Sequence, residues 1–246
     1  MKYLIGNWKM HTTVPEAVAL AGRLEDAVGD AARAGKSLET VVVCPPFVAL
    51  TAVRDVLDDR TLRVGAQDCH WEDAGAHTGE VSAEMLRDVA EFVLLGHSER
   101  RAAGEDNDQI AKKVAAAARA GLTPVLCVGE PNPDDVATQH AEEELRAGLT
   151  ELDANSDHHL LVAYEPVWAV GSGKAAESKH VGEVVTHLRS VLAELGHGPA
   201  EVLYGGSVTR QNASEFAAVD GLDGLLVGGA SLNPGEFAGI IEGVAS

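Results

Sequence analysis

The chain has 246 residues, of which 46% are hydrophobic and 23% charged. This length suits one or two globular domains, because a barrel of about 250 residues often forms a single unit with a large core. The 19 basic and 38 acidic side chains give a formal net charge of −19, which argues against nucleic-acid and lipid-surface partners because it repels their phosphates.

The cysteines and the opening of the chain predict its compartment. Cys44, Cys69 and Cys127 are odd in number and far apart, and the chain opens MKYLIGNWKM rather than with a basic stretch followed by a long apolar run. We therefore expect a reducing cytoplasm. No apolar run approaches the roughly 18 residues that a membrane helix requires, so no membrane partner is expected.

Short runs rich in Val, Leu and Ile recur along the chain without the polar alternation of half-exposed strands, which predicts strands buried on both faces. In chain order they lie at residues 3–6, 40–44, 62–66, 92–96, 124–129, 160–165, 201–204 and 223–228. Between most of them lies a segment of helical period. The clearest is 178–195, where Val181, Val184, Val185 and Leu188 follow the i, i+3, i+4, i+7 pattern of an apolar helix face.

Residues typical of helix ends support these helical segments. Thr13 with Glu16, and Asn233 with Glu236, have capping-box spacing, and Gly121 fits a helix C-cap. The strand–helix unit repeats about eight times without a long polar linker, which is typical of βαβ crossovers within one α/β domain. Eight units can close into a single (β/α)8 barrel over residues 1–246, although an open doubly wound sheet fits the same pattern.

Polar side chains stand at the ends of three predicted strands. Lys9 and His97 follow the first and fourth, and Glu165 ends the sixth. Because the carboxyl ends of parallel strands meet on one side of an α/β domain, we expect these side chains to converge. An apolar setting beside Tyr164 and Pro166 would make Glu165 a stronger base, and a helix start after His97 would keep its ring neutral.

Glycines at strand ends predict a site for an anion. They stand in the runs 171–174 (GSGK), 205–207 (GGS) and 228–229 (GG). In barrels, a phosphate often binds at the loops after strands seven and eight, beside the start of a short helix. Backbone N–H groups can bind it there despite the negative net charge.

Two other patterns do not indicate a cofactor. The spacing Gly171-x-Gly173-x-x-Ala176 fits a loose dinucleotide fingerprint but lacks the strand–turn–helix setting of that motif. The histidines near Cys69 and the pair at 158–159 lack the ligand spacing of a tetrahedral metal site. We expect neither a cofactor nor a metal.

Five separated segments resemble the triosephosphate isomerase family, in order and nearly from end to end of the chain. They are residues 7–10 (NWKM), 96–100 (GHSER), 164–174 (YEPVWAVGSGK), 204–208 (YGGSV) and 226–232 (LVGGASL). The resemblance implies a (β/α)8 barrel, usually dimeric, that acts in glycolysis and gluconeogenesis. It interconverts dihydroxyacetone phosphate and D-glyceraldehyde 3-phosphate through an enediolate, without cofactor or metal.

The resemblance also implies a role for each site residue. As in this well-known family, Glu165 would move the proton between two carbons, His97 would polarise the oxygens and Lys9 would stabilise the anion. Glu99 would contact Lys9 and His97 and hold them in place without touching the substrate. The implied substrate contacts are Asn7, Lys9, Gly171, Ser207, Gly228 and Gly229.

Two further segments take functions from the same resemblance. A lid would run from the stiff Pro166, Val167 and Trp168 to the small residues around Gly171 and Gly173, with Lys174 at its second hinge. The loop 67–80 would form the homodimer contact. Three residues depart from the family pattern near that contact: His11, Asp68 and His77.

Two other functions stay open on sequence alone. A relative acting on a four-carbon sugar phosphate would use the same base and the same phosphate site. A barrel without catalysis could bind a phosphate metabolite, although it has no need of Lys9, His97 and Glu165 together.

Overall fold

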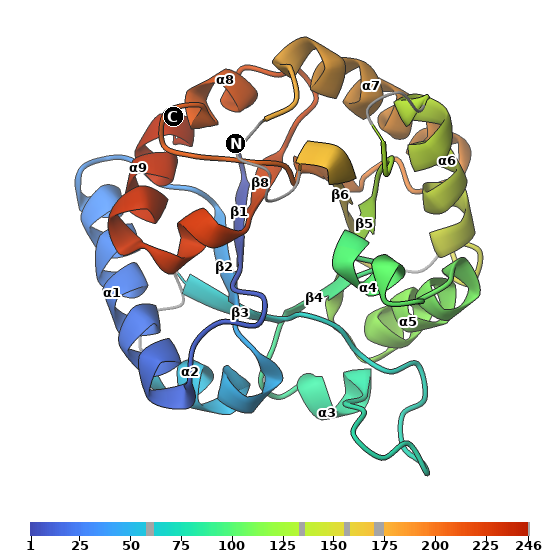
Figure 1. Ribbon diagram of the computed structural model, residues 1–246, viewed down its shortest axis with the longest axis horizontal. Coiled ribbons are helices and arrows are strands. Elements are labelled where there is room, and N and C mark those ends of the chain that lie inside the picture. The colour runs from blue at the N-terminus through green and yellow to red at the C-terminus, as the bar shows by residue number, and fades with distance from the viewer. Residues whose placement is uncertain (58–61, 133–135, 155–157, 170–174, 246) are drawn as a thin grey trace.

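Eight parallel strands close into a barrel in the computed structural model of the chain, which describes residues 1–57, 62–132, 136–154, 158–169 and 175–245 (Figure 1). The first strand pairs with both the second and the last, since Tyr3 lies opposite Thr40 and opposite Gly224. This closure confirms the barrel and excludes the open sheet. The strands are β1 (Tyr3–Asn7), β2 (Thr40–Cys44), β3 (Leu62–Ala66), β4 (Phe92–Leu95), β5 (Thr123–Val128), β6 (Leu161–Tyr164), β7 (Glu201–Tyr204) and β8 (Gly224–Val227).

The helices form a ring outside the strands, as Figure 1 shows. The α-helices are α1 (Val14–Arg33), α2 (Leu50–Val56), α3 (Ala83–Leu86), α4 (Ser98–Ala102), α5 (Asn107–Arg119), α6 (Ala137–Gly148), α7 (Ser178–Glu194), α8 (Ala213–Ala217) and α9 (Pro234–Val244). The described residues also form short 3-10 helices at η1 (Phe47–Ala49), η2 (Val167–Ala169) and η3 (Gly229–Leu232). The predicted helix at 178–195 is confirmed as α7.

The barrel has two apolar layers, which explains why its strands lack polar alternation. Alternate side chains such as Ile5 and Leu94 fill the inside of the barrel, where they form one cluster. Their neighbours, such as Leu4 and Val93, face outward and pack in a second cluster with apolar side chains of the helices. Both faces of each strand are therefore buried, as the apolar runs predict.

Strand bounds agree with the predicted ones to within one residue, and the differences have local causes. Gly96 is predicted within a strand but lies after β4, because its φ of +68° takes the chain into the left-handed region. The C-cap residue of α5 is Ala120, and Gly121 follows it at φ +80°, so the glycine predicted for this helix end lies one residue beyond the cap.

The two predicted capping boxes differ. Thr13 N–H donates to Glu16 Oε2 at 2.8 Å, as expected. At α9, Asn233 Oδ1 accepts from Gly235 and Glu236 N–H, but the Asn233 N–H does not donate to the Glu236 carboxylate. The Asn233 N–H donates instead to the Ala230 carbonyl of η3, so this predicted box is only half formed.

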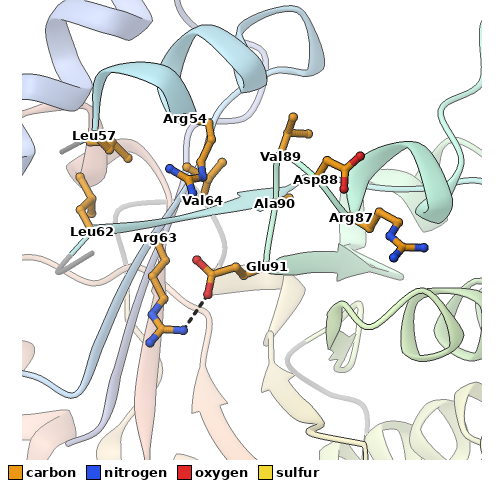
Figure 2. A pocket seen from close by; sticks show the side chains of 10 residues that line it. All are labelled: Arg54, Leu57, Leu62, Arg63, Val64, Arg87, Asp88, Val89, Ala90 and Glu91. Atoms are coloured by element: carbon orange, nitrogen blue, oxygen red, sulfur yellow. Dashed lines mark hydrogen bonds and ion pairs between the residues drawn. The ribbon is translucent and has the colours of Figure 1, made fainter. Parts of the chain in front are cut away.

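A hollow of about 160 Å³ lies at the amino ends of β3 and β4, among Leu62, Arg63 and Glu91 (Figure 2). An ion pair of 2.7 Å joins Arg63 to Glu91 across it. In a barrel of this kind, ligands bind at the carboxyl ends of the strands, and the amino ends serve stability. The candidate site therefore lies at the other end.

Candidate active site

Lys9, His97 and Glu165 line one cavity of about 200 Å³ at the carboxyl ends of the strands. They come from the ends of β1, β4 and β6, which confirms that the three predicted side chains converge. Asn7 lines the same cavity. The His97 and Glu165 side chains are only 6% and 3% exposed, and His97 Nε2 lies 3.2 Å from Glu165 Oε1.

Local hydrogen bonding fixes the tautomer of His97. The residue caps α4, and its Nδ1 accepts the Glu99 N–H at 3.1 Å. Because a ring nitrogen that accepts carries no proton, the neutral ring has its proton on Nε2, which faces the cavity and Glu165. His97 can therefore donate a hydrogen bond to an oxygen in the cavity.

Backbone groups hold both the side chain and the main chain of Glu165. Its Oε2 accepts the Ser98 N–H at 3.2 Å, and its main-chain N–H donates to Val128 O at 2.8 Å. Two glycines leave space for it. A Cβ at Gly205 would lie 2.8 Å from Glu165 Cγ, and one at Gly129 would lie 1.9 Å from Glu165 O. Glycine is thus required beside the Glu165 side chain, at position 205, and beside its main chain, at position 129.

Lys9 is held in a backbone conformation that non-glycine residues rarely adopt, with φ +52°. Two side-chain amides support it: Asn7 Oδ1 accepts the Lys9 N–H at 2.9 Å, and Gln67 Nε2 donates to Lys9 O at 2.8 Å. The ammonium lies 2.7 Å from Glu99 Oε1. Burial opposes ionisation of Glu99, yet this hydrogen bond and the charge of Lys9 hold the pKa of Glu99 below its ordinary value.

The loops after β7 and β8 form the other wall of the cavity. Ser207, Gly228 and Gly229 line it, and η3 begins at Gly229. This is the place where barrels bind phosphate through N–H groups beside a short helix. A Cβ at Gly229 would meet no atom within 4 Å, so its backbone is open to an approaching ligand.

The segment after Glu165 is tied to a buried carboxylate. Trp168 Nε1 donates to Glu130 Oε1 at 2.7 Å, and the Tyr164 hydroxyl donates to the same carboxylate at 3.0 Å. Burial and the neighbouring Glu130 charge raise the pKa of Tyr164. On the C-terminal side of the predicted lid, Ala176 N–H donates to the Tyr204 hydroxyl at 3.1 Å. Gly171, Gly173 and Lys174 of the predicted lid lie outside the described residues.

Several residues of the site were not predicted. The Gln67 amide, the Ser98 N–H and the Glu130 carboxylate each hold a group of the site through a tertiary contact. Gln67 follows β3 directly, so the rule applied to the other strand ends could have found it. Nothing in the local sequence signals that Ser98 and Glu130 meet residues so far along the chain.

Comparison with known proteins shows the family. The family model described as triosephosphate isomerase matches residues 2–244 of this chain. The chain belongs to the triosephosphate isomerase family. A triosephosphate isomerase of Moorella thermoacetica is 44% identical over 97% of each chain, and one of Magnetococcus marinus is 44% identical over 99% of this chain and 98% of its own.

A solved structure agrees. The crystal structure of triosephosphate isomerase from Bartonella henselae matches with a TM-score of 0.85 and 31% identity, and covers 98% of each chain. The chain is an isomerase of the triosephosphate isomerase family, which interconverts dihydroxyacetone phosphate and D-glyceraldehyde 3-phosphate in glycolysis. In the described part of the chain, no helix combines the length and apolar character needed to span a lipid bilayer.

Proposed function

We propose that Glu165, His97 and Lys9 are the catalytic residues of this isomerisation, within one catalytic domain over residues 1–246. Glu165 removes a proton from the carbon next to the substrate carbonyl and returns it to the neighbouring carbon. The supporting observation is the 3.2 Å approach of a buried Glu165 carboxylate to His97 Nε2 in the cavity. A base of this kind typically contributes a factor of about 10²–10⁴ in rate.

His97 and Lys9 stabilise the charge that this step creates. Removal of the proton places negative charge on the former carbonyl oxygen, and the result is an enediolate. The Nε2–H of His97 donates to that oxygen, while the Lys9 ammonium at the same cavity lowers the energy of the anion. Both groups stand in place before the reaction. His97 is fixed by the Glu99 N–H, the Lys9 main chain by Asn7 and Gln67, and the Lys9 ammonium by the Glu99 carboxylate.

Asn7, Gly171, Ser207, Gly228 and Gly229 bind the substrate, the glycines and Ser207 through N–H groups to its phosphate. The position of Ser207, Gly228 and Gly229 along one wall supports this, with Glu165 and His97 on the same cavity. Pro166 to Lys174 serve as the lid. The bond of Ser207 Oγ to Ala169 O at 2.7 Å links the proposed phosphate wall to the segment that follows the base.

Replacement of Glu165 by Gln tests these roles. The variant keeps its shape but cannot take a proton, so its kcat with D-glyceraldehyde 3-phosphate should fall about 10²–10⁴-fold in a coupled assay. Inhibition by inorganic phosphate should be unchanged. The matched control is Glu91→Gln, which alters a carboxylate at the opposite end of the barrel. A Glu165→Gln enzyme with normal kcat would refute the assignment.

The chain pairs with a second copy of itself through the loop 67–80. Residues 72–80 are exposed, and Figure 1 shows this segment projecting beyond α3. Exposed apolar side chains follow β1 and β2, with Met10 95% and Val48 77% exposed. Because each follows the carboxyl end of a strand, we assign both side chains to the proposed contact.

We place the enzyme in the cytoplasm. Cys44, Cys69 and Cys127 are all unpaired and buried, as suits a reducing compartment. Fractionation of cells that carry a tagged chain, with activity measured in each fraction, tests the location.

A further inference from the structure

One ion pair behind the cavity binds backbone groups of two neighbouring strand ends. Arg101 of α4 lies 3.3 Å from Glu144 of α6, and both side chains are largely buried, at 17% and 12% exposed. The Arg101 guanidinium also donates to Gly96 O at 2.8 Å and to Cys127 O at 3.2 Å. These carbonyls belong to the residue directly after β4 and to β5. Neither Arg101 nor Glu144 lines the cavity itself.

The first of these contacts holds the chain on the amino side of His97. Gly96 directly precedes His97, and its φ of +68° turns the chain away from β4. Arg101 binds the Gly96 carbonyl at this turn and, through its own N–H, the His97 carbonyl at 3.1 Å. The carbonyl that precedes His97 and the carbonyl of His97 itself thus both accept hydrogen bonds from Arg101.

Glu144 binds the stretch of main chain that packs against Glu165. Its Oε2 accepts the Gly129 N–H at 2.9 Å. Gly129 lies directly against the Glu165 main chain, since a Cβ there would be 1.9 Å from Glu165 O. The preceding residue, Val128, accepts the Glu165 N–H. A shift of residues 128–129 would therefore move the base.

We propose that Arg101 and Glu144 are positioning residues that set the distance between His97 and Glu165. This inference rests on the proposed roles of those two residues. The guanidinium suits this work because its planar fork offers five N–H donors at fixed angles, whereas a lysine ammonium is a compact charge on a flexible stem. Arg101 uses that fork for Gly96, Cys127, Glu144 and Asn107 together.

Electrostatics link the two partners. Burial raises the pKa of Glu144, and the charge of Arg101 opposes that rise. Loss of the guanidinium would leave a buried carboxylate that favours protonation, and a protonated Glu144 accepts the Gly129 N–H less strongly. Loss of Arg101 would therefore also weaken the bond of Glu144 to Gly129, which packs against Glu165.

The barrel contains a matched control at its other end. Arg189 Nε donates to Gly221 O at 2.7 Å, and its guanidinium pairs with Asp223, which accepts the Val202 N–H at 2.9 Å. The chemistry is the same: one arginine, one glycine carbonyl, and one carboxylate bound to a backbone N–H. This second pair lies before β8, away from the cavity, so its loss should affect stability alone.

The test compares Arg101→Lys with Arg189→Lys in the full chain. Since a misplacement of about 1 Å can cost about 10²-fold, kcat of Arg101→Lys should fall by about 10–10²-fold, with the inhibition constant of inorganic phosphate unchanged. Arg101→Lys and Arg189→Lys should lower the melting temperature by similar amounts. Arg189→Lys should keep kcat within about twofold, because Arg189 does not touch the site. Equal kcat in both variants would overturn the proposal.

A second variant keeps the test decisive if Arg101→Lys does not fold. Glu144→Gln keeps an acceptor for Gly129 but loses the charge that pairs with Arg101. A lower kcat with unchanged phosphate inhibition supports the proposal, and a normal kcat overturns it. In the double variant, the loss should be no larger than in the worse single one, because the pair acts as a unit. Glu165→Gln, assayed in parallel, separates the two ideas: if it keeps normal kcat, the proposed function fails first.

Discussion

The Lys9 ammonium lies 2.7 Å from the Glu99 carboxylate, although 90 positions separate the two residues in the chain. β1 and β4 are not neighbours in the barrel, so only its closure brings their ends together. The Glu99 side chain is 59% exposed, and a pair this open to water contributes little to stability. Its effect is to hold the ammonium at the cavity.

Replacement of Glu99 by Gln should weaken substrate binding. Exposed ion pairs contribute about 0.2–1 kcal/mol, so we expect KM for D-glyceraldehyde 3-phosphate to rise by up to about fivefold. Because the pKa of Glu99 is lowered in the folded enzyme, its carboxylate is charged above the ordinary value of about 4.3, and its effect on KM is lost only as pH falls through the lowered pKa. The ratio of the KM values should therefore stay constant from about pH 5 to 8. A step in that ratio within this range would contradict the pairing.

Replacement of Gly129 by Ala should displace the base. Its Cβ would come within 1.9 Å of the Glu165 carbonyl oxygen, which is main chain and cannot rotate away. We expect kcat to fall about 10²-fold, as a shift of about 1 Å can cause. Gly22→Ala on α1 is the control, because a Cβ there meets nothing within 4 Å. It should gain about 0.5–1 kcal/mol of stability and keep full activity. Comparable kcat losses in both variants would contradict the reason given.

Replacement of Lys113 by Met should destabilise the fold. The ammonium is buried, lies 2.8 Å from Asp68 and also bonds to Glu105. Without it, the carboxylates lose their buried partner, which costs about 3–5 kcal/mol. Urea unfolding at pH 7 measures this loss. Lys112→Met, on the exposed face of the same helix, should change stability by less than about 0.5 kcal/mol.

The same ion pair predicts an alkaline limit. Burial alone would lower the pKa of Lys113, but Asp68 and Glu105 raise it. A raised folded pKa means that the contribution is complete below the unfolded value of about 10.4 and is lost as pH rises through the folded pKa. The stability difference between the parent chain and Lys113→Met should thus persist to about pH 10. A difference that disappears already at pH 8 would show that the pair is not the cause.

Replacement of Val48 by Lys should separate the proposed dimer. Val48 is 77% exposed, and we assign its side chain to the contact, so a charge there opposes burial. Sedimentation at micromolar concentration should show a shift from dimer to monomer. Val136→Lys is the control, because Val136 is 64% exposed and precedes α6. If the parent chain is itself monomeric, or if both variants stay dimeric, the assigned contact is wrong.

Much of the site follows from the sequence because it depends on local features. Buried parallel strands end in residues that must lie on one side of the sheet, and this rule alone brings Lys9, His97 and Glu165 together. The tautomer of His97 is also local, since its Nδ1 bonds to a backbone N–H only two residues away. The effect of the glycines at 228–229 is local too, because a residue without a side chain leaves its own backbone open to a ligand in the cavity.

Other features depend on contacts between distant segments, and the sequence pattern carries no record of them. The eight runs fit an open sheet as well as a barrel until β8 pairs with β1. The bond of Ser98 to Glu165 and the contacts of Arg101 with Gly96 and Cys127 depend on how neighbouring strands are staggered. The spacing at Asn233 predicted a full capping box, but the Ala230 carbonyl competes for its N–H. Periodicity and spacing thus determined which residues reach the end of the barrel, while packing between strands and helices decided the distances at which they meet.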